Sequence, residues 1–301
     1  MTPPVFIAGP TASGKSEIAL RVAEKIGGEI ISVDSMQVYR GLDIGTAKPS
    51  PGERARVPHH LIDVCDLHDA FDAAQFVRQA QMAVTEIQAR GAVPVFCGGT
   101  GLYFKAFLEG LGEAPPADAL LRVQLEALPL ETLLTELREG DPVAFEKIDR
   151  RNPRRVVRAV EVLRLTGRAF SGQKAEWRSR AQNSSPGNFF VFTRATDDLR
   201  QRINLRVDEM FDRGLLEETR QLLRHGLAEN KFAMQAIGYR QVVEHLRGDY
   251  SLAEAVEQVK VRTRQFAKRQ MTWFRAQPGV MWMELRPDAD PAEIAATITR
   301  S

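Results

Sequence analysis

The segment from Gly9 to Ser16 has the residue types and spacing of a phosphate-binding loop. It reads Gly9-Pro10-Thr11-Ala12-Ser13-Gly14-Lys15-Ser16, which fits the pattern G-x-x-x-x-G-K-[ST]. The backbone N–H groups of such a loop surround phosphate oxygens, and the following helix adds its partial positive charge. Lys15 would supply a full charge, and the Ser16 hydroxyl is placed to bind Mg²⁺. The loop predicts a site for a di- or triphosphate with Mg²⁺ as cofactor.

Asp34 is a candidate general base. It directly follows the apolar run 29–33, and ligands bind at the carboxyl edge of open α/β sheets. A carboxylate beside a bound phosphate ester can accept a proton from an incoming nucleophile. Asp34 would be explained equally well as a residue that hydrogen-bonds to a metal ligand, or as a cap for the next turn.

A second glycine-rich segment follows the apolar run 93–97. It reads Gly98-Gly99-Thr100-Gly101, where an ATPase or kinase would carry a metal-binding aspartate. The Thr100 hydroxyl and the exposed N–H groups of this segment suit further phosphate binding. Thr100 is also a suitable helix N-cap.

The elements around these residues alternate between strand and helix patterns. Apolar runs at 5–8, 29–33, 93–97 and 189–192 predict strands, and 280–285 predicts a last one. Helical periodicity is present over 17–26, 71–90 and 102–108, and a capping box at Ser251-Leu252-Ala253-Glu254 starts a helix toward Trp273. This alternation predicts an α/β fold, with a parallel sheet flanked by helices as in P-loop NTPases.

The organisation changes near Glu113-Ala114-Pro115-Pro116. From there to about Gly187 the sequence has helical patterns but no good strand, and 183–187 has the composition of a linker. We therefore expect a helical, basic insertion domain at 113–187. The α/β core would comprise 1–112 and 188–301.

Basic residues are concentrated in two segments of a chain whose formal net charge is only +2. Between residues 150 and 180 ten side chains are Lys or Arg and two, Glu161 and Glu176, are acidic. Between residues 258 and 275 six are Lys or Arg and none is acidic. In the second segment Lys260, Arg264 and Lys268 share one helical face, with Arg262 and Arg269 beside them. This distribution indicates a polyanionic partner, although solvated helix faces would give the same pattern.

The composition is that of an ordinary globular protein. No apolar run approaches the length needed to span a bilayer, and the first residues lack a signal-peptide pattern. Cys65 and Cys97 have no partners at metal-ligand spacing and are read as reduced core thiols. We expect a cytoplasmic monomer.

Several motifs together resemble tRNA dimethylallyltransferase, the bacterial tRNA isopentenyltransferase family. They are the loop 9–16, Ile31-Ser32-Val33-Asp34-Ser35 with Gln37-Val38-Tyr39, 43–49, 98–103, Gly238-Tyr239-Arg240-Gln241 and 267–275. They occur in order over nearly the whole chain. No cysteine follows Cys97, so the resemblance is to the bacterial type without a zinc finger.

The resemblance implies transfer of a dimethylallyl group from dimethylallyl diphosphate to N6 of the adenosine just 3′ of the anticodon. Asp34 would then be the base for the N6 amine. Lys15, Thr100 and an arginine of the segment 201–206, Arg206 in preference to Arg202, would bind the pyrophosphate leaving group. The target base must leave its stack to reach Asp34.

The expected partner is the tRNA anticodon stem-loop. Predicted tRNA contacts are Asp34, Ser35, Met36, Gln37, Thr100, Arg122, Arg154, Arg155, Val156, Val157, Arg158, Gln235, Ala236, Ile237, Gly238, Tyr239, Arg240, Lys268 and Arg269. Three alternatives remain at this stage. They are a small-molecule P-loop kinase, an enzyme that prenylates free adenine nucleotide, and a non-catalytic, nucleotide-gated RNA-binding module.

Overall fold

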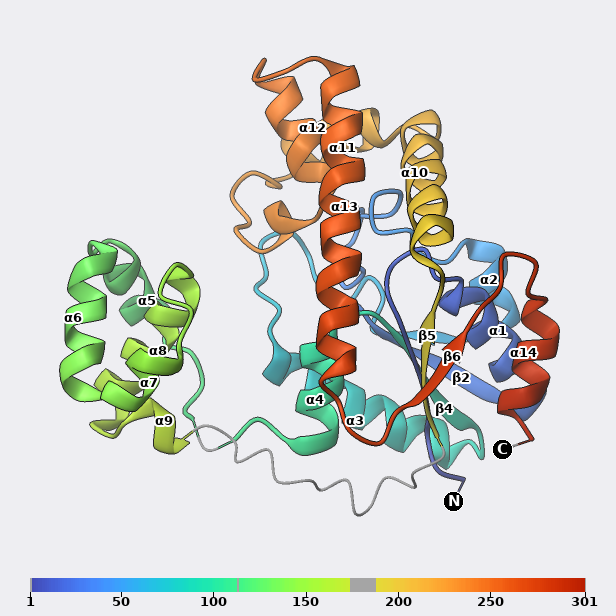
Figure 1. Cartoon of the computed structure of the whole chain (residues 1–301), viewed down its shortest axis with the longest axis horizontal. Helices are drawn as coiled ribbons and strands as arrows, with labels where there is room; N and C mark the ends of the chain where they lie inside the picture. The colour runs from blue at the N-terminus through green and yellow to red at the C-terminus, as the bar shows by residue number, and fades with distance from the viewer. Residues whose placement is uncertain (1, 113, 174–187, 301) are drawn as a thin grey trace. The chain divides into compact units, whose positions relative to one another are not determined.

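The structure is a computed structural model that describes residues 2–112, 114–173 and 188–300. Its chain forms two compact units, one made of Met1–Lys105 with Asn183–Ser301 and the other of Ala106–Gln182. Figure 1 shows the elements of both units. The predicted linker 183–187 lies outside the described residues.

The larger unit is built on a six-stranded sheet in which every strand pair is parallel. The strands are β1 (Val5–Ala8), β2 (Gly28–Val33), β3 (His59–His60), β4 (Val93–Gly98), β5 (Phe189–Thr193) and β6 (Met281–Glu284), in the order β3-β2-β4-β1-β5-β6. The predicted α/β fold is confirmed. The short strand β3 is the one strand that the sequence pattern does not predict.

Helices cover both faces of this sheet because its central strands are apolar on both sides. On one face Ile7 and Cys97 pack with residues of α1 (Lys15–Ile26) and α14 (Pro291–Ile298). On the other face the neighbouring residues Phe6 and Phe96 stack, with ring centroids 4.9 Å apart. This alternation is the consequence of the two-residue period of a strand.

The helices on this second face meet through aromatic rings. Phe76 of α3 (Ala73–Ala89) stacks on Tyr103 of α4 (Gly101–Glu109) at 4.4 Å between centroids. Phe104 contacts Phe274 of α13 (Leu252–Arg275). The start of α13 has the predicted capping box between Ser251 and Glu254. These contacts seat the C-terminal end of α13 against the sheet.

The remaining helices of this unit are α2 (Pro51–Arg56), α10 (Thr196–Asp212), α11 (Leu215–Arg224) and α12 (Tyr239–Leu246). Helix α13 packs against both α10 and α12. None of the helices in the described ranges is long and apolar enough to cross a membrane.

The smaller unit is helical over its described residues. It contains α5 (Ala119–Glu126), α6 (Leu130–Gly140), α7 (Pro142–Lys147), α8 (Pro153–Thr166) and α9 (Phe170–Gln173). Its own core includes Leu125, Leu133, Leu137, Phe145 and Val156. The amphipathic periodicity of α8 therefore serves packing within this unit.

Candidate functional site

The predicted site residues follow neighbouring strands at one edge of the sheet. The loop 9–16 follows β1, Asp34 follows β2, and the segment 98–101 follows β4. All three strands are parallel and adjacent, so their carboxyl ends meet at the same edge. Ligands of open α/β sheets bind there.

Two arginines hold the phosphate loop by its carbonyl groups. Arg194, which follows β5, donates from Nε to the carbonyl oxygen of Ser13 at 2.7 Å. Arg202 of α10 donates from Nε to the carbonyl oxygen of Ala12 at 3.0 Å. Ala12 has φ 62°, a left-handed conformation that is uncommon outside glycine. Since these carbonyl groups are bound from outside, this side of the loop is held in a fixed conformation.

A cavity of about 420 Å³ lies over the loop. Thr11, Lys15 and Ser16 line one part of it, and Asp34 and Gln37 line another. Apolar side chains complete its wall: Leu20, Ile30, Ile62, Met210 and Phe266. The cavity thus joins a cationic phosphate site, a carboxylate and an apolar surface.

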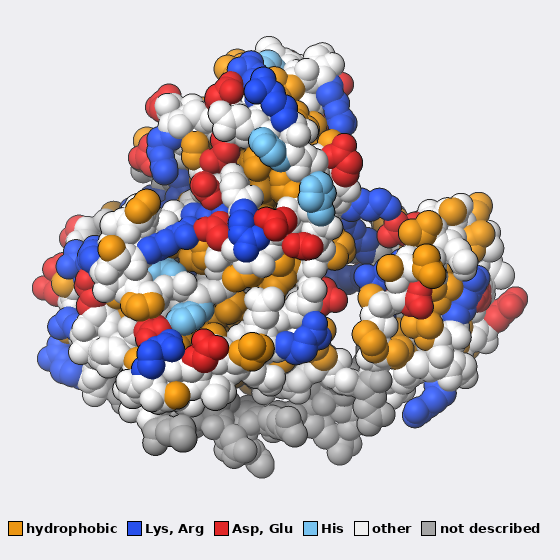
Figure 2. Space-filling model, turned by 180° about the vertical axis from the view of Figure 1, so that it is seen from behind, with side chains coloured by type: hydrophobic (Ala, Val, Ile, Leu, Met, Phe, Trp, Pro, Cys, Tyr) orange, Lys and Arg blue, Asp and Glu red, His pale blue; other side chains and the backbone are white. Residues whose placement is uncertain are grey.

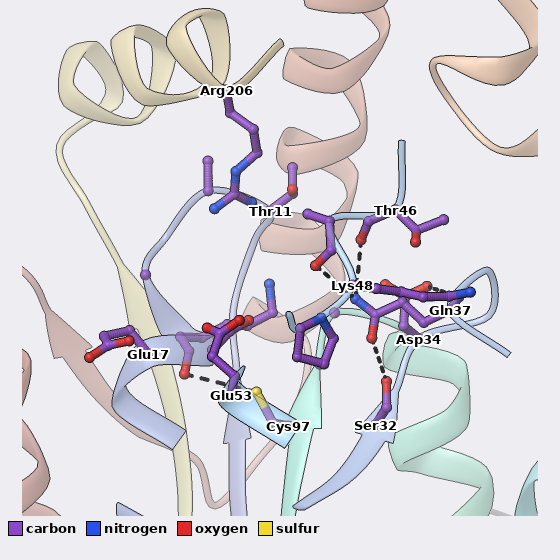
Figure 3. Close-up of a pocket in the computed structure, with 18 of the residues that line it drawn as sticks. Thr11, Glu17, Ser32, Asp34, Gln37, Thr46, Lys48, Glu53, Cys97 and Arg206 are labelled. Atoms are coloured by element: carbon purple, nitrogen blue, oxygen red, sulfur yellow. Dashed lines mark hydrogen bonds between the residues drawn. The ribbon is translucent and has the colours of Figure 1, made fainter. Parts of the chain in front are cut away.

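Lys15 and Arg206 bring positive charge into this cavity. Figure 3 shows Arg206 extending from α10 toward the phosphate loop, with Asp34 on the opposite side. Burial lowers the pKa of Lys15, and the neighbouring Arg206 lowers it further. Burial also lowers the pKa of Arg206, with Arg202 adding to the effect. Two like charges held close together in a partly buried site are stabilised when an anion binds between them.

Asp34 uses one carboxylate oxygen to shape its own turn. Oδ1 accepts hydrogen bonds from the backbone N–H groups of Met36 at 2.8 Å and Gln37 at 3.3 Å. Asp34 is therefore a turn cap through Oδ1, while Oδ2 has no hydrogen-bond donor among the described residues.

Thr100 forms a hydrogen bond with Ser35, the residue that follows Asp34. Its Oγ1 atom accepts a hydrogen bond from the N–H of Ser35 at 3.2 Å, and it is not among the described residues that line the cavity. Thr100 also begins α4, since its carbonyl oxygen accepts from Tyr103 and Phe104. The hydroxyl thus links the loop after β4 to the loop after β2.

Gln37 joins β2 to another wall of the cavity. Its Oε1 accepts from the hydroxyl of Ser32 at 2.9 Å, and its Nε2 donates to the carbonyl oxygen of Thr46 at 3.1 Å. The predicted tRNA contact at Gln37 therefore concerns a side chain whose amide already has protein partners.

The donor groups fit a Mg²⁺ ion held mainly by a phosphate ligand. Ser16 lines the cavity together with Asp34, Glu17 and Glu53. Among the described residues no group of three His, Cys, Asp or Glu side chains could hold a metal by itself. Mg²⁺ commonly takes one or two protein ligands and completes its shell with phosphate oxygens and water.

The segment 235–240 contains both exposed and buried members. Gln235 and Arg240 are exposed, Ile237 is half-buried, and Ala236, Gly238 and Tyr239 are buried. The Tyr239 hydroxyl contacts Glu218 and accepts from the N–H of Gly45 at 3.0 Å. A tRNA contact by the Tyr239 side chain is excluded in this conformation because it packs inside the protein.

In the smaller unit the predicted tRNA contacts also divide by burial. Val156 and Val157 are in its core, so their side chains cannot reach a partner. Arg122 and Arg158 form ion pairs with the buried carboxylate of Glu161. The remaining two, Arg154 and Arg155, are exposed at the start of α8.

The basic face predicted on α13 is only partly exposed. Lys260 pairs with Asp208 of α10 at 2.8 Å, and Arg264 donates to Asn204 of the same helix at 2.6 Å. Lys268 and Arg269 are exposed. Figure 2 shows basic and acidic side chains mixed over one face of the molecule.

No site role is predicted from the sequence for Cys97, Arg194 or Gln270. Cys97, expected to be a core thiol, is buried and free, but it also lines the cavity, and burial raises its pKa to about 11. Arg194 and Gln270 contact the phosphate loop from segments far along the chain. Gln270 lies in the motif 267–275, but Arg194 lies in none of the motifs quoted above. Local periodicity carries no information on such long-range contacts.

The fold and the cavity define a P-loop α/β protein with a carboxylate beside its phosphate-loop motif. The IPP transferase family model matches residues 37–277. The tRNA dimethylallyltransferase of Geobacter sulfurreducens is 45% identical over 95% of this chain and 93% of its own length. That of Pelotomaculum thermopropionicum is 40% identical over 99% and 96%.

Solved structures agree. The full-length tRNA isopentenylpyrophosphate transferase of Bacillus halodurans superposes with a TM-score of 0.72, at 38% identity, covering 100% of this chain and 96% of that one. A eukaryotic dimethylallyltransferase acting on tRNA has a TM-score of 0.78 at 28% identity, covering 94% and 74%. The chain belongs to the IPP transferase family, and it is an enzyme that transfers a prenyl group.

Proposed function

We propose that this enzyme transfers a dimethylallyl group from dimethylallyl diphosphate to N6 of the adenosine adjacent, on the 3′ side, to the anticodon of tRNA. The observation that carries the proposal is the single cavity that joins the phosphate loop, Asp34 and an apolar wall. The names of its relatives, which are tRNA dimethylallyltransferases, support the dimethylallyl group and a tRNA acceptor.

The cavity favours an allylic diphosphate over a nucleotide as the donor. Leu20, Ile30 and Ile62 offer a hydrocarbon chain an apolar surface beside Lys15. The loop after β4 carries glycines and Thr100 in place of the metal-binding aspartate of an ATPase. The phosphate loop then serves to bind a leaving group.

In the proposed reaction the N6 nitrogen of adenine attacks C1 of the dimethylallyl group as the bond from C1 to the diphosphate oxygen breaks. Oδ2 of Asp34 accepts the proton that N6 releases. Lys15, Arg206 and the N–H groups of the loop stabilise the negative charge that develops on pyrophosphate. The exocyclic amine is a weak nucleophile, so its orientation toward C1 is a large part of catalysis.

Arg206 is proposed as the diphosphate-binding arginine in preference to Arg202. Arg202 uses Nε on the carbonyl oxygen of Ala12, whereas no protein acceptor contacts the Arg206 guanidinium among the described residues. Thr100 is proposed to orient the Asp34 loop through Ser35. Mg²⁺ bound through Ser16 would neutralise part of the diphosphate charge.

The tRNA is proposed to contact the exposed members of the predicted set: Arg154, Arg155, Gln235, Arg240, Lys268 and Arg269. Base flipping would bring the target adenine to Asp34.

The test is incubation of the protein with dimethylallyl diphosphate, Mg²⁺ and an anticodon stem-loop, with product analysis by mass spectrometry. Prenylated adenosine at that position is the expected product. Parallel reactions use free AMP as acceptor and ATP as donor. Prenylation of AMP would indicate an enzyme that prenylates free nucleotides and would contradict the proposal. Phosphoryl transfer from ATP would indicate a kinase and would also contradict it.

A further inference from the structure

The side chain of Gln270 connects the two loops that the proposed reaction must hold in register. We propose that Gln270 is a positioning residue that sets the phosphate loop relative to the loop carrying Thr100 and, through it, Asp34. The inference rests on the function proposed above, because it concerns the spacing between the leaving-group site and the base.

Gln270 makes one hydrogen bond to each loop. Its Oε1 accepts from the N–H of Thr11 at 2.9 Å, and its Nε2 donates to the carbonyl oxygen of Gly99 at 3.0 Å. The residue is only 6% exposed. A primary amide is suited to this position, since it carries one acceptor and one donor at a fixed separation.

Helix α13 approaches the second loop so closely that only glycine fits. A Cβ atom on Gly99 would lie 2.1 Å from Nε2 of Gln270. A Cβ atom on Gly101 would lie 2.2 Å from the ring of Trp273. The segments 98–101 and 270–273 are thus two sides of one contact, which explains the glycines on one side and the amide on the other.

Short hydrogen-bonded steps lead from Gly99 to Asp34. The N–H groups of Gly99 and Thr100 both donate to the carbonyl oxygen of Val33, at 3.2 and 3.1 Å. The hydroxyl of Thr100 accepts from the N–H of Ser35. Asp34 lies between Val33 and Ser35, which these hydrogen bonds anchor, so a shift of Gly99 would shift the Asp34 carboxylate.

We call the pair of hydrogen bonds from Gln270 to Thr11 and Gly99 the Gln270 bridge. Its other end lies at the phosphate loop. Thr11 precedes Ala12 and Ser13, whose carbonyl oxygens are bound by Arg202 and Arg194. The loop is therefore held on its α10 and β5 side by arginines and on its α13 side by Gln270. The contribution of Gln270 is the one that also reaches the base.

The spacing matters because substitution at carbon requires the nucleophile, C1 and the leaving oxygen to be aligned. A misplacement of about 1 Å can reduce a rate by roughly 10²-fold. Loss of the bridge should therefore reduce kcat more than it weakens the binding of either substrate.

The experiment compares wild type with Q270M, which keeps the length of the side chain and removes both hydrogen bonds, and with Q270E, which keeps an acceptor for Thr11. The matched control is Q265M, a change at an exposed glutamine of the same helix. Titration with inorganic pyrophosphate by calorimetry counts competent sites, and kcat and KM are then expressed per titrated site.

We expect Q270M to bind close to one pyrophosphate per chain, with kcat per site lower by about 10- to 100-fold and KM for the stem-loop within about twofold of wild type. Q270E should lie between Q270M and wild type, and Q265M should match wild type. Wild-type kcat per site in Q270M or Q270E would overturn the proposal. A loss in kcat that the number of titrated sites fully explains would also overturn it, since that is the result of unfolding.

The two proposals fail in different ways. A wild-type enzyme that prenylates nothing counts against the function proposed above. An active wild type with an equally active Q270M counts against the bridge alone.

Discussion

Arg202 binds the carbonyl oxygen of Ala12 through Nε at 3.0 Å, and this contact separates its role from that of Arg206, one turn further along α10. Both arginines line the cavity, but Arg202 also supports a loop residue in a left-handed conformation, whereas Figure 3 shows the Arg206 side chain extending toward the phosphate loop. Two arginines in one helix are thus expected to respond differently to the same substitution.

The R206A variant should lose about 10²- to 10³-fold in kcat, the usual effect of removing one donor to a developing oxyanion. R202A should lose less in kcat and more in thermal stability, because it releases the backbone of the loop. Steady-state kinetics and thermal melts of both proteins test this, with R200A on the exposed side of α10 as control. Equal kinetic losses in R206A and R202A would contradict the assignment.

The D34N variant should fold normally and lose at least about 10²-fold in the rate of prenyl transfer. The carboxamide of this variant can still accept the N–H groups of Met36 and Gln37 through its oxygen, as Oδ1 does in the wild type, but it cannot take a proton from the amine. Single-turnover kinetics with saturating stem-loop isolate this step, and the affinity for the stem-loop serves as the control. Full activity of D34N would remove Asp34 from the role of base.

Pyrophosphate affinity should fall as pH rises into the alkaline range. Burial lowers the pKa of Lys15 below its ordinary value of 10.5, so the cation that binds phosphate is lost at a lower pH than for an exposed lysine. The folding stability of the protein without pyrophosphate should instead rise with pH between the lowered pKa of Lys15 and its ordinary value of 10.5. In that range the unfolded state binds more protons than the folded state does. Calorimetry and thermal melts at several pH values measure both trends.

The control for this prediction is a pair of methionine variants. K15M should bind pyrophosphate weakly and lose the pH dependence, whereas K25M, a change in the last turn of α1, should retain it. The same pH dependence in K15M as in wild type would assign the effect to another group.

In the smaller unit, Arg122 and Arg158 should behave as structural residues and Arg154 and Arg155 as tRNA-binding residues. Glu161 is buried and accepts hydrogen bonds from Arg122 at 2.9 and 3.1 Å, from Arg158, and from the N–H of Asp118. Burial by itself raises the pKa of Glu161, but the two arginines and the N–H outweigh it and lower the pKa. The ion pairs should therefore stabilise the folded state fully at pH values above the ordinary pKa of about 4.5. This stabilisation should be lost as the pH falls through the lowered pKa of Glu161.

Variants of Arg122 and Glu161 should therefore destabilise this unit. E161A should cost about 3 kcal/mol, since it leaves two arginines without their carboxylate. R154A and R155A should leave the melting temperature unchanged, raise KM for the stem-loop and reduce its dependence on salt. A melting temperature of E161A equal to that of wild type, or an unchanged salt dependence in R154A, would contradict this division.

Patterns of short range predict much of the fold and part of the site. The strand at 93–97 and the helix at 71–90 follow from apolar periodicity, and the structure has them as β4 and α3 within two residues. The loop 9–16 and Asp34 are recognised because adjacent residues carry the pattern and each directly follows a strand. The sequence also shows that glycines and Thr100, and not the metal-binding aspartate of an ATPase or kinase, follow β4.

Burial and pairing of side chains could not be predicted in the same way. Tyr239 belongs to a motif that suggests tRNA binding, yet its ring packs inside the protein with its hydroxyl on Glu218 and Gly45. Lys260 belongs to a regular basic stripe, yet it pairs with Asp208 because α13 packs on α10. A periodic pattern specifies a face of a helix but does not say which neighbour covers that face.

By itself the sequence determined the class of fold, the phosphate loop and the position of the candidate base, since each depends on residues close together in the chain. Tertiary structure decided that Arg202 binds the carbonyl oxygen of Ala12 and that Gln270 spans the two loops, although Gln270 lies 259 positions along the chain from Thr11. The physical reason is that these contacts exist only after the sheet has brought the ends of β1, β2 and β4 together and α13 has packed across them.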